Sequence, residues 1–216
     1  MYHTPRPTAA PGRLLVLEGL DGAGTTTQAR SLVETLRAQG HEAYLTREPS
    51  DGPIGRLIRE MLTGRHAIPD AAIDPKTFAL LFAADRMDHL QREVGPALAR
   101  GAIVVSDRWY HSTYAYQAMG TAELPWLQTL NRHAWIPDLT IFLAIRPEVA
   151  AARRVAAGRV QELFEDLPTQ QRVAAGYVDT LMVLDRHERI HVLDGELPLA
   201  TITAQVTQAV LDYLAA

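Results

Sequence analysis

Residues 13–26 read RLLVLEGLDGAGTT, and this stretch decides the fold. Residues 14–17 form a short apolar run without helical spacing, which is typical of a buried parallel strand. Glycines end the run, and from residue 26 to residue 38 apolar side chains recur at helical spacing until Gly40. The stretch therefore predicts a strand, a glycine-rich turn and a helix, which together begin an α/β domain.

Further short apolar runs resemble the first and predict strands at residues 43–46, 102–106, 139–145 and 189–193. The segments between them predict helices at residues 52–63, 74–100, 112–119, 123–134, 170–185 and 199–214, and after Pro147. We expect an interruption near Gly95-Pro96 and a polar break at residues 158–169. The alternation predicts one α/β domain over residues 13–216, with a five-stranded parallel sheet and helices on both faces. The proline-containing residues 1–12 predict a disordered lead-in.

The composition excludes several classes of function. The 216 residues contain 21 Lys and Arg, 25 Asp and Glu and no Cys, with a formal net charge of -4. This balance excludes bulk binding of nucleic-acid phosphates, and the lack of Cys excludes disulfides and thiolate chemistry. No apolar run is long enough to span a membrane, so we expect no membrane partner and a cytoplasmic location. From the charge balance we expect no nucleic-acid partner. Lys76 is the only lysine; every other basic residue is Arg.

Residues 19–26, GLDGAGTT, form a phosphate loop in which one residue departs from the pattern GxxxxGK[ST]. The glycines let backbone N–H groups surround phosphate oxygens, and the following helix adds its positive end. Thr25 stands where the pattern has lysine, so the ammonium that offsets phosphate charge is missing. A tight turn without a ligand is the alternative for such a motif alone. The candidate ATP-binding residues are Gly19, Gly22, Ala23, Gly24, Thr25, Thr26 and Thr27.

Three more segments make the pattern specific: TREP at residues 46–49, FALLFAADR at residues 78–86 and DRWYHSTYAYQ at residues 107–117. With the phosphate loop, they resemble the thymidylate kinase family, and the resemblance runs over nearly the whole chain from Leu14. It implies a P-loop NTPase-type three-layer α/β/α fold with a lid segment. It also implies transfer of the γ-phosphoryl group of ATP to dTMP, giving dTDP, with Mg²⁺ as cofactor and a homodimer as the assembly.

The resemblance also assigns a site for dTMP. Phe82 would stack on the thymine ring, Arg86 would hydrogen-bond the base, and Tyr116 would lie under the deoxyribose. Arg108 would clamp the monophosphate through its planar fork of donors. From the residues alone, core packing is the alternative for Phe82. The implied dTMP-binding residues are Asp21, Arg47, Phe82, Arg86, Arg108, Ser112, Thr113, Tyr116 and Gln117.

The catalytic residues implied by the resemblance surround the phosphates. Thr26 and Asp107 would hold Mg²⁺, directly or through water. The lid segment covers about residues 153–172, and its arginines would offset the missing lysine when the lid closes. Residues 162–165, ELFE, resemble the family's DRxE-like element, with Leu163 in place of the arginine, and Gly22 stands where some members place a loop arginine. The implied catalytic residues are Asp21, Asp107, Arg108, Arg153 and Arg159, and Arg154 and Arg172 are further lid arginines.

Two alternatives stay open at this point. Because Thr25 and Leu163 both remove cations, the chain could be a diverged nucleotide-binding protein that has lost phosphoryl transfer. It could also be a kinase for another deoxynucleoside monophosphate. The histidines form no metal-ligand or triad pattern, and we expect His111 and His133 to be structural or surface residues.

Overall fold

The computed structural model describes residues 3–5, 10–66, 73–118, 122–158, 162–184 and 186–215. Within them, a five-stranded sheet has the strand order β2-β3-β1-β4-β5, and all of its pairings are parallel. Each predicted apolar run lies in a strand of this sheet. The strands are β1 (Arg13–Gly19), β2 (Ala43–Arg47), β3 (Ile103–Asp107), β4 (Leu139–Ala144) and β5 (Ile190–Asp194).

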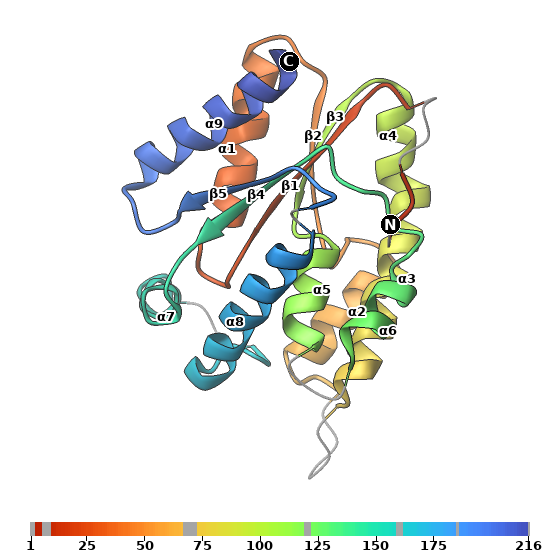
Figure 1. Cartoon of the computed structure of the whole chain (residues 1–216), viewed down its shortest axis with the longest axis vertical. Coiled ribbons are helices and arrows are strands. Elements are labelled where there is room, and N and C mark those ends of the chain that lie inside the picture. Colours follow the sequence, from red (N-terminus) through yellow and green to blue (C-terminus); the bar gives the residue numbers. More distant parts are fainter. Residues whose placement is uncertain are drawn as a thin grey trace.

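Helices cover both faces of the sheet and confirm the three-layer α/β/α architecture (Figure 1). On one face lie α1 (Thr25–Ala38) and α9 (Leu199–Ala215), which pack on the strands in one apolar cluster. The other face carries most of the remaining helices. The remaining α-helices of the described residues are α2 (Pro53–Leu62), α3 (Pro75–His89), α4 (Gly95–Ala99), α5 (Tyr110–Gln117), α6 (Leu124–Leu130), α7 (Pro147–Ala156) and α8 (Leu167–Leu184).

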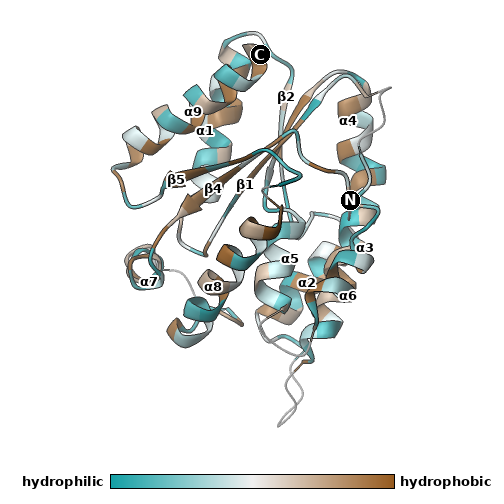
Figure 2. Cartoon of the chain, viewed as in Figure 1, coloured by the Kyte–Doolittle hydropathy of each residue, from teal (hydrophilic) through white to brown (hydrophobic). Residues whose placement is uncertain are grey.

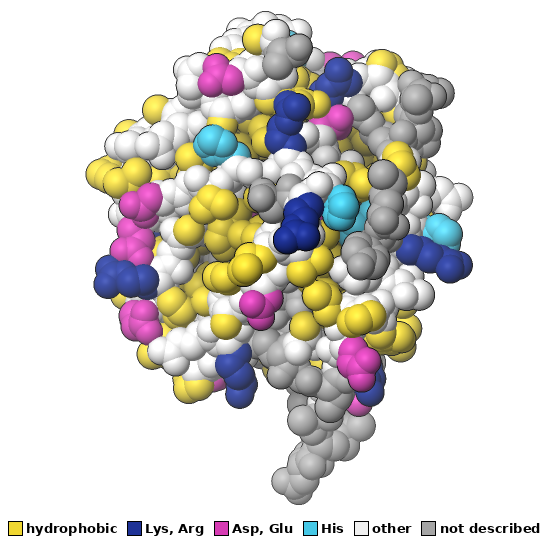
Figure 3. All heavy atoms as spheres, viewed as in Figure 1, with side chains coloured by type: hydrophobic (Ala, Val, Ile, Leu, Met, Phe, Trp, Pro, Cys, Tyr) yellow, Lys and Arg dark blue, Asp and Glu magenta, His cyan; other side chains and the backbone are white. Residues whose placement is uncertain are grey.

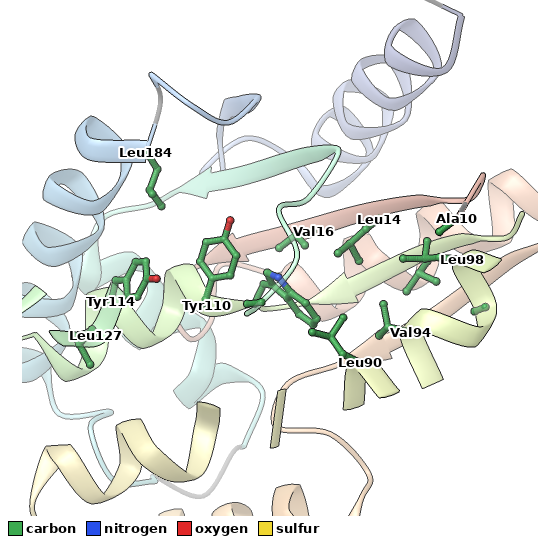
Figure 4. Packing of buried hydrophobic residues seen from close by; sticks show 14 of the residues in the cluster. Ala10, Leu14, Val16, Leu90, Val94, Leu98, Tyr110, Tyr114, Leu127 and Leu184 are labelled. Atoms are coloured by element: carbon green, nitrogen blue, oxygen red, sulfur yellow. The ribbon is translucent and has the colours of Figure 1, made fainter. Parts of the chain in front are cut away.

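The core forms because the central strands are apolar on both faces. Figure 2 shows β1 and β4 as hydrophobic stretches in the middle of the molecule. Leu14 and Val16 of β1 pack on α4 and α5, and Figure 4 shows Tyr110 and Tyr114 of α5 in the same cluster. The opposite faces of β1 and β3 pack on α1 and α9. Burying these side chains supplies the main driving force for folding.

The helices differ most from the predicted ranges in three places. The long helix is not broken at Gly95-Pro96; a π-helical turn, η1 (Leu90–Val94), widens it just before. Pro96 has no N–H to donate, so the wider turn absorbs the missing hydrogen bond without ending the helix. The helix expected at residues 123–134 ends at Leu130, and α8 begins at Leu167, which shortens the expected polar break.

The expected disorder of residues 1–12 is wrong for the described part of this segment. The His3 ring is buried and stacks on Tyr110 with ring centroids 3.9 Å apart, and Thr4 bridges to Trp135. Ala10 is buried in the same cluster. The prolines prevent regular structure here, but buried apolar and aromatic contacts hold these residues in place.

The surface carries charges of both signs. On the face in Figure 3, basic and acidic side chains are dispersed among apolar and neutral ones. Within the described residues, no helix is both long enough and apolar enough to cross a lipid bilayer.

Candidate active site

The register of the sheet brings the phosphate loop to the end of β3. Leu17 of β1 pairs with Asp107 of β3, so the loop that follows β1 lies beside Asp107 and Arg108. Because β1 is central and the chain crosses to both sides of it, a crevice opens at the carboxyl ends of the strands. The sequence-predicted residues of the two strand ends therefore come together here.

The phosphate loop has the backbone geometry that an anion site needs. Gly24 has φ of 97°, a left-handed conformation that glycine adopts without a Cβ clash, and α1 begins at the next residue. In the described structure no side chain caps this helix, so its first N–H groups face the loop. A Cβ on Gly22 would lie 2.5 Å from the carbonyl oxygen of Ala150. Position 22 therefore has no room for a loop arginine.

A phosphate cavity of about 360 Å³ opens around this loop. Thr25 is only 5% exposed, and its side chain contributes a hydroxyl where the pattern has lysine. Of the predicted ATP-binding residues, Gly19 and Ala23 do not line the cavity, because they form the buried base of the loop. Among the described residues, the cavity is lined by Asp21, Gly22, Gly24, Thr25, Thr26, Thr27, Arg47, Glu48, Asp107, Arg108, Arg153, Arg154 and Ala157.

Thr26 and Asp107 form an oxygen pair inside the phosphate cavity. The Thr26 hydroxyl donates to Oδ2 of Asp107 at 2.5 Å. The other carboxylate oxygen, Oδ1, is buried and has no hydrogen-bond partner among the described residues. Mg²⁺ is bound in proteins by one or two carboxylates together with waters and substrate phosphates, so this pair fits that ion. No cluster of three or more His, Asp or Glu residues suited to a metal occurs in the described part of the chain.

Arg108 sits between the two strand ends in a strained conformation. Its φ is 79°, which is rare for a non-glycine residue and is associated with functional sites. Its Nη1 donates to the carbonyl oxygen of Gly19 and, at 2.8 Å, to the Tyr177 hydroxyl. Its Nη2 donates to Oδ1 of Asp21 at 2.8 Å, and the side chain is 14% exposed. The guanidinium is therefore held in one orientation at the mouth of both cavities.

Glu18, which sequence reasoning missed, organises the surroundings of Arg108. Its carboxylate is fully buried and accepts hydrogen bonds from the backbone of Trp109 at 2.8 Å and from the hydroxyls of Ser112 and Tyr177 at 2.7 and 2.8 Å. The only sign of this role in the sequence was that Glu18 is a carboxylate at the end of an apolar strand. The hydroxyl of Ser112, a predicted dTMP-binding residue, thus donates its hydrogen bond to Glu18.

The pKa values at this site keep its groups in fixed charge states. Burial raises the pKa of the Tyr116 phenol, and the Asp21 carboxylate raises it further. The phenol stays protonated and donates to Oδ2 of Asp21 at 2.7 Å. Burial lowers the pKa of Arg108, but Tyr177, Tyr116, Asp21 and Glu18 outweigh that effect, so the net pKa is raised and the guanidinium stays charged.

A base pocket of about 140 Å³ adjoins the phosphate cavity. The two share Asp21, Glu48 and Arg108, so a ligand spanning them meets these side chains at the junction. Every predicted dTMP-binding residue except Arg47 lines the base pocket; Arg47 lines the phosphate cavity. The described lining is Asp21, Glu48, Pro49, Leu62, Phe82, Arg86, Arg108, Trp109, Ser112, Thr113, Tyr116, Gln117, Glu162, Leu163 and Phe164.

The aromatic and polar groups of the base pocket are positioned by α3 and α5. Phe78 is fully buried, whereas Phe82, one turn later, is only half-buried and faces the pocket. Phe78 is therefore a core residue, whereas Phe82 packs against Phe78 and also lines the pocket. Gln117 is 2% exposed, and its Oε1 has no hydrogen-bond partner among the described residues. Because Gln117 also lines the base pocket, this oxygen is available to a donor group of a ligand there.

Arg86 is 1% exposed and fixed by protein contacts. Its Nε donates to Glu48 at 2.8 Å, its Nη2 donates to Thr113 at 3.1 Å, and its Nη1 donates to the side-chain oxygen of Asn131. Nη1 carries a second N–H, which leaves a donor for a ligand in the pocket. Sequence reasoning missed Glu48 and Asn131 because neither carries a motif that identifies the partner of Arg86.

The lid segment is divided between the two cavities. Glu162, Leu163 and Phe164 line the base pocket. The Phe164 ring packs edge-on against the Phe78 ring, with the two ring centroids 5.4 Å apart. Arg153 lines the phosphate cavity and donates to the carbonyl oxygen of Gly195 at 2.8 Å. Arg172 is exposed and lines neither cavity. The predicted catalytic residue Arg159 lies outside the described residues.

Arg154 contacts the phosphate loop more closely than Arg153 does. It is 6% exposed and donates to the carbonyl oxygens of Asp21 and, at 2.8 Å, of Glu165. Its Nε lies 3.8 Å from the Glu165 carboxylate. Arg154 therefore links the phosphate loop to the lid segment through hydrogen bonds and an ion pair.

The histidines predicted to be structural lie away from these cavities. His111 is fully buried, and its Nε2 lies 2.9 Å from the carboxylate of Glu188. Burial raises the pKa of Glu188, but His111, Tyr110 and His3 together outweigh this effect, so the net pKa is lowered. His133 is exposed and contacts Arg132.

Comparison with known proteins agrees with this architecture. A family model described as thymidylate kinase matches residues 17–206. The thymidylate kinase of Ruegeria pomeroyi is 39% identical over 209 residues, which cover 94% of this chain and 96% of that protein. The thymidylate kinase of Dinoroseobacter shibae is 40% identical over 201 residues, covering 91% and 95% of the two chains. The probable thymidylate kinase of Pyrococcus abyssi is 40% identical over 167 residues, covering 77% and 82%. The chain belongs to the thymidylate kinase family.

Proposed function

We propose that this protein transfers the γ-phosphoryl group of ATP to dTMP, giving dTDP and ADP. The observation that carries the proposal is the pair of adjoining cavities that share Asp21, Glu48 and Arg108. One has a phosphate loop at a helix N-terminus, and the other has aromatic and amide groups suited to a base. A phosphate oxygen of dTMP attacks the γ-phosphorus at the junction, and the bond from that phosphorus to the oxygen of ADP breaks.

The base pocket supports a thymine ring as the acceptor's base. Phe82 offers a face for stacking, which is worth about 1–3 kcal/mol per base. The unpartnered amide oxygen of Gln117 suits the ring N–H of thymine, and the free N–H of Arg86 suits a ring carbonyl. Tyr116, held by Asp21, would lie under the deoxyribose and leave no room for a 2′-hydroxyl.

The reaction depends on positioning and electrostatics, because the acceptor phosphate is already an anionic nucleophile. Arg108 clamps the acceptor phosphate with donors whose orientation Asp21 and Tyr177 fix directly and Glu18 fixes through Tyr177. Thr26 and Asp107 would hold Mg²⁺, which neutralises developing phosphate charge when it is bound. The phosphate-loop amides orient the donor phosphates.

Arginines replace the lysine that the phosphate loop lacks. Arg47, Arg108, Arg153 and Arg154 line the phosphate cavity, and Thr25 adds only a hydroxyl. Guanidinium groups bind phosphate oxygens bidentately and keep their charge when buried. The positive charge around the reacting phosphates therefore comes from strand ends and α7.

The proposed assembly is a homodimer formed through α2 and α3. Leu57, Leu80 and Met87 on these helices are 40%, 51% and 44% exposed. Met87 also lines a surface cavity of about 550 Å³ together with Trp135. Exposed apolar groups of this kind mark interaction surfaces. The cytoplasmic location stays a prediction.

The test is a comparison of acceptors with the purified protein. With ATP and Mg²⁺, we expect kcat/KM for dTMP to exceed that for dCMP and dGMP by at least about 10²-fold. The cytosine N3 is an acceptor and cannot donate to Gln117. Guanine offers a suitable N–H and carbonyl, but its two rings are too large for a pocket of about 140 Å³ that accepts one ring. Because dUMP lacks only the methyl group, its kcat/KM should be lower by about 10-fold. Equal use of dCMP or dGMP would assign the protein to another deoxynucleoside monophosphate.

A further inference from the structure

An N-terminal strap, residues 3–5, lies outside the residues that match the family model. It crosses the turn after α6, where Thr4 donates from its hydroxyl to the carbonyl oxygen of Arg132 at 2.8 Å. His3 is 6% exposed and reaches the carbonyl oxygen of Asn131 and the hydroxyl of Tyr114 at 3.1 and 2.9 Å. The strap thus contacts the turn that carries Asn131.

The hydrogen bonds of His3 fix its tautomer. The Asn131 carbonyl oxygen can only accept, so Nδ1–H of His3 donates to it, and Nε2 accepts from the Tyr114 hydroxyl. Burial lowers the pKa of His3 to about 4, with smaller opposing effects from Glu188 and Asn131. The ring is therefore neutral at physiological pH and can make both bonds.

Asn131 connects this histidine to the base pocket. Its backbone carbonyl oxygen accepts from Nδ1–H of His3 and, at 2.8 Å, from the N–H of Ala134. Its side-chain Nδ2 donates to the carbonyl oxygen of Leu127 at 2.9 Å, and its side-chain oxygen accepts from Nη1 of Arg86. Asn131 is 2% exposed and follows the last residue of α6, and its backbone N–H donates to the carbonyl oxygen of Leu127 at 3.1 Å. The His3 bond is the contact through which the N-terminal strap helps to hold Asn131.

We propose that His3 is a positioning residue for the base pocket: by holding Asn131, it fixes the guanidinium of Arg86 that faces the base. This inference rests on the proposed function, because it assigns the ligand of Arg86 to dTMP. The N-terminal strap is thus part of the acceptor site and not only of the core. The donor site is separate, since none of the contacts of His3 or Asn131 involves the phosphate loop.

The test uses His3→Phe, which keeps the buried aromatic ring against Tyr110 and removes both hydrogen bonds. We expect the Kd for dTMP to rise about 10-fold and the Kd for ATP to change less than about 2-fold. In the Asn131→Ala background, the same substitution should change the Kd for dTMP less than about 2-fold, because the connection is already cut. Thr4→Ala, which removes a strap hydrogen bond without touching Asn131, is the matched control and should bind dTMP like the wild type.

Three results would overturn the inference: unchanged dTMP binding by His3→Phe, an equal loss of ATP binding, or an equal effect in the Asn131→Ala background. A ligand-free measurement separates this inference from the proposed function. The NMR signal of the Arg86 Nε–H, identified by its loss in Arg86→Lys, should lose protection from exchange in His3→Phe but not in Thr4→Ala. If wild type does not bind dTMP while this signal responds, the proposed function fails and the positioning role stands.

Discussion

Replacing Arg108 by Ala is expected to lower kcat/KM for dTMP by on the order of 10³-fold, or about 4 kcal/mol of transition-state stabilisation. Arg108 stands at the junction of the two cavities, the proposed place of phosphoryl transfer, and its donors are fixed by Asp21 and Tyr177. Removing it takes away a charged, preoriented donor set and leaves the Asp21 carboxylate without its ion-pair partner. The measurement is the initial rate of dTDP formation with dTMP varied at saturating ATP.

Two further variants show whether the effect of Arg108→Ala comes from the charge, the planar fork or the loss of any arginine. Arg108→Lys keeps the charge but lacks the planar fork, so its kcat/KM should lie between those of Ala and the wild type. Arg172→Ala removes an exposed arginine of α8 that lines neither cavity and should retain wild-type activity. An Arg108→Ala enzyme within tenfold of wild type in kcat/KM for dTMP would refute the assigned role.

Replacing Arg154 by Ala is expected to destabilise the fold by about 3 kcal/mol, because the buried Glu165 carboxylate loses a charged partner. The rate of dTDP formation should also fall about 10²-fold, because Arg154 no longer hydrogen-bonds both the Asp21 carbonyl of the phosphate loop and the Glu165 carbonyl beside Phe164. Denaturant unfolding measures the first effect, and the rate of dTDP formation below the unfolding transition measures the second.

Arg153→Ala is the matched comparison for stability. Arg153 is the adjacent arginine on α7, is half-buried, and donates to a single carbonyl oxygen. Its removal should change the free energy of unfolding by less than about 1 kcal/mol. Equal destabilisation by the two substitutions would show that the Arg154 contacts have no special role in joining the loop to the lid.

The fold follows from the sequence because its signals are local. Residues 14–17 and the glycines after them predict β1 and the phosphate loop, and the other apolar runs predict the remaining strands. The helix-widening turn before Pro96 is harder to predict, because it depends on how the chain absorbs a missing donor. The sequence predicted an irregularity near Gly95-Pro96, and η1 lies just before Gly95, but the sequence did not predict that the irregularity is a π-helical turn.

The site was predictable where it carries a motif and missed where it depends on long-range pairing. Arg108 and Phe82 lie in recognisable segments, and both line the base pocket. Glu18 acts through Tyr177, which lies 159 residues away, and His3 acts through Asn131, 128 residues away. Side-chain pairs at such separations are fixed by packing, which periodicity and composition do not encode.

The turnover number of the wild-type protein tests most directly whether arginines replace the lysine that the phosphate loop lacks. With ATP, Mg²⁺ and dTMP at saturation, we expect a kcat of at least about 1 per second, in the range of kinases. Because arginines already supply charge in the phosphate cavity, Thr25→Lys should change kcat by less than about tenfold. A wild-type protein that binds dTMP without forming dTDP, together with turnover restored by Thr25→Lys, would contradict the account and show that the chain has lost phosphoryl transfer.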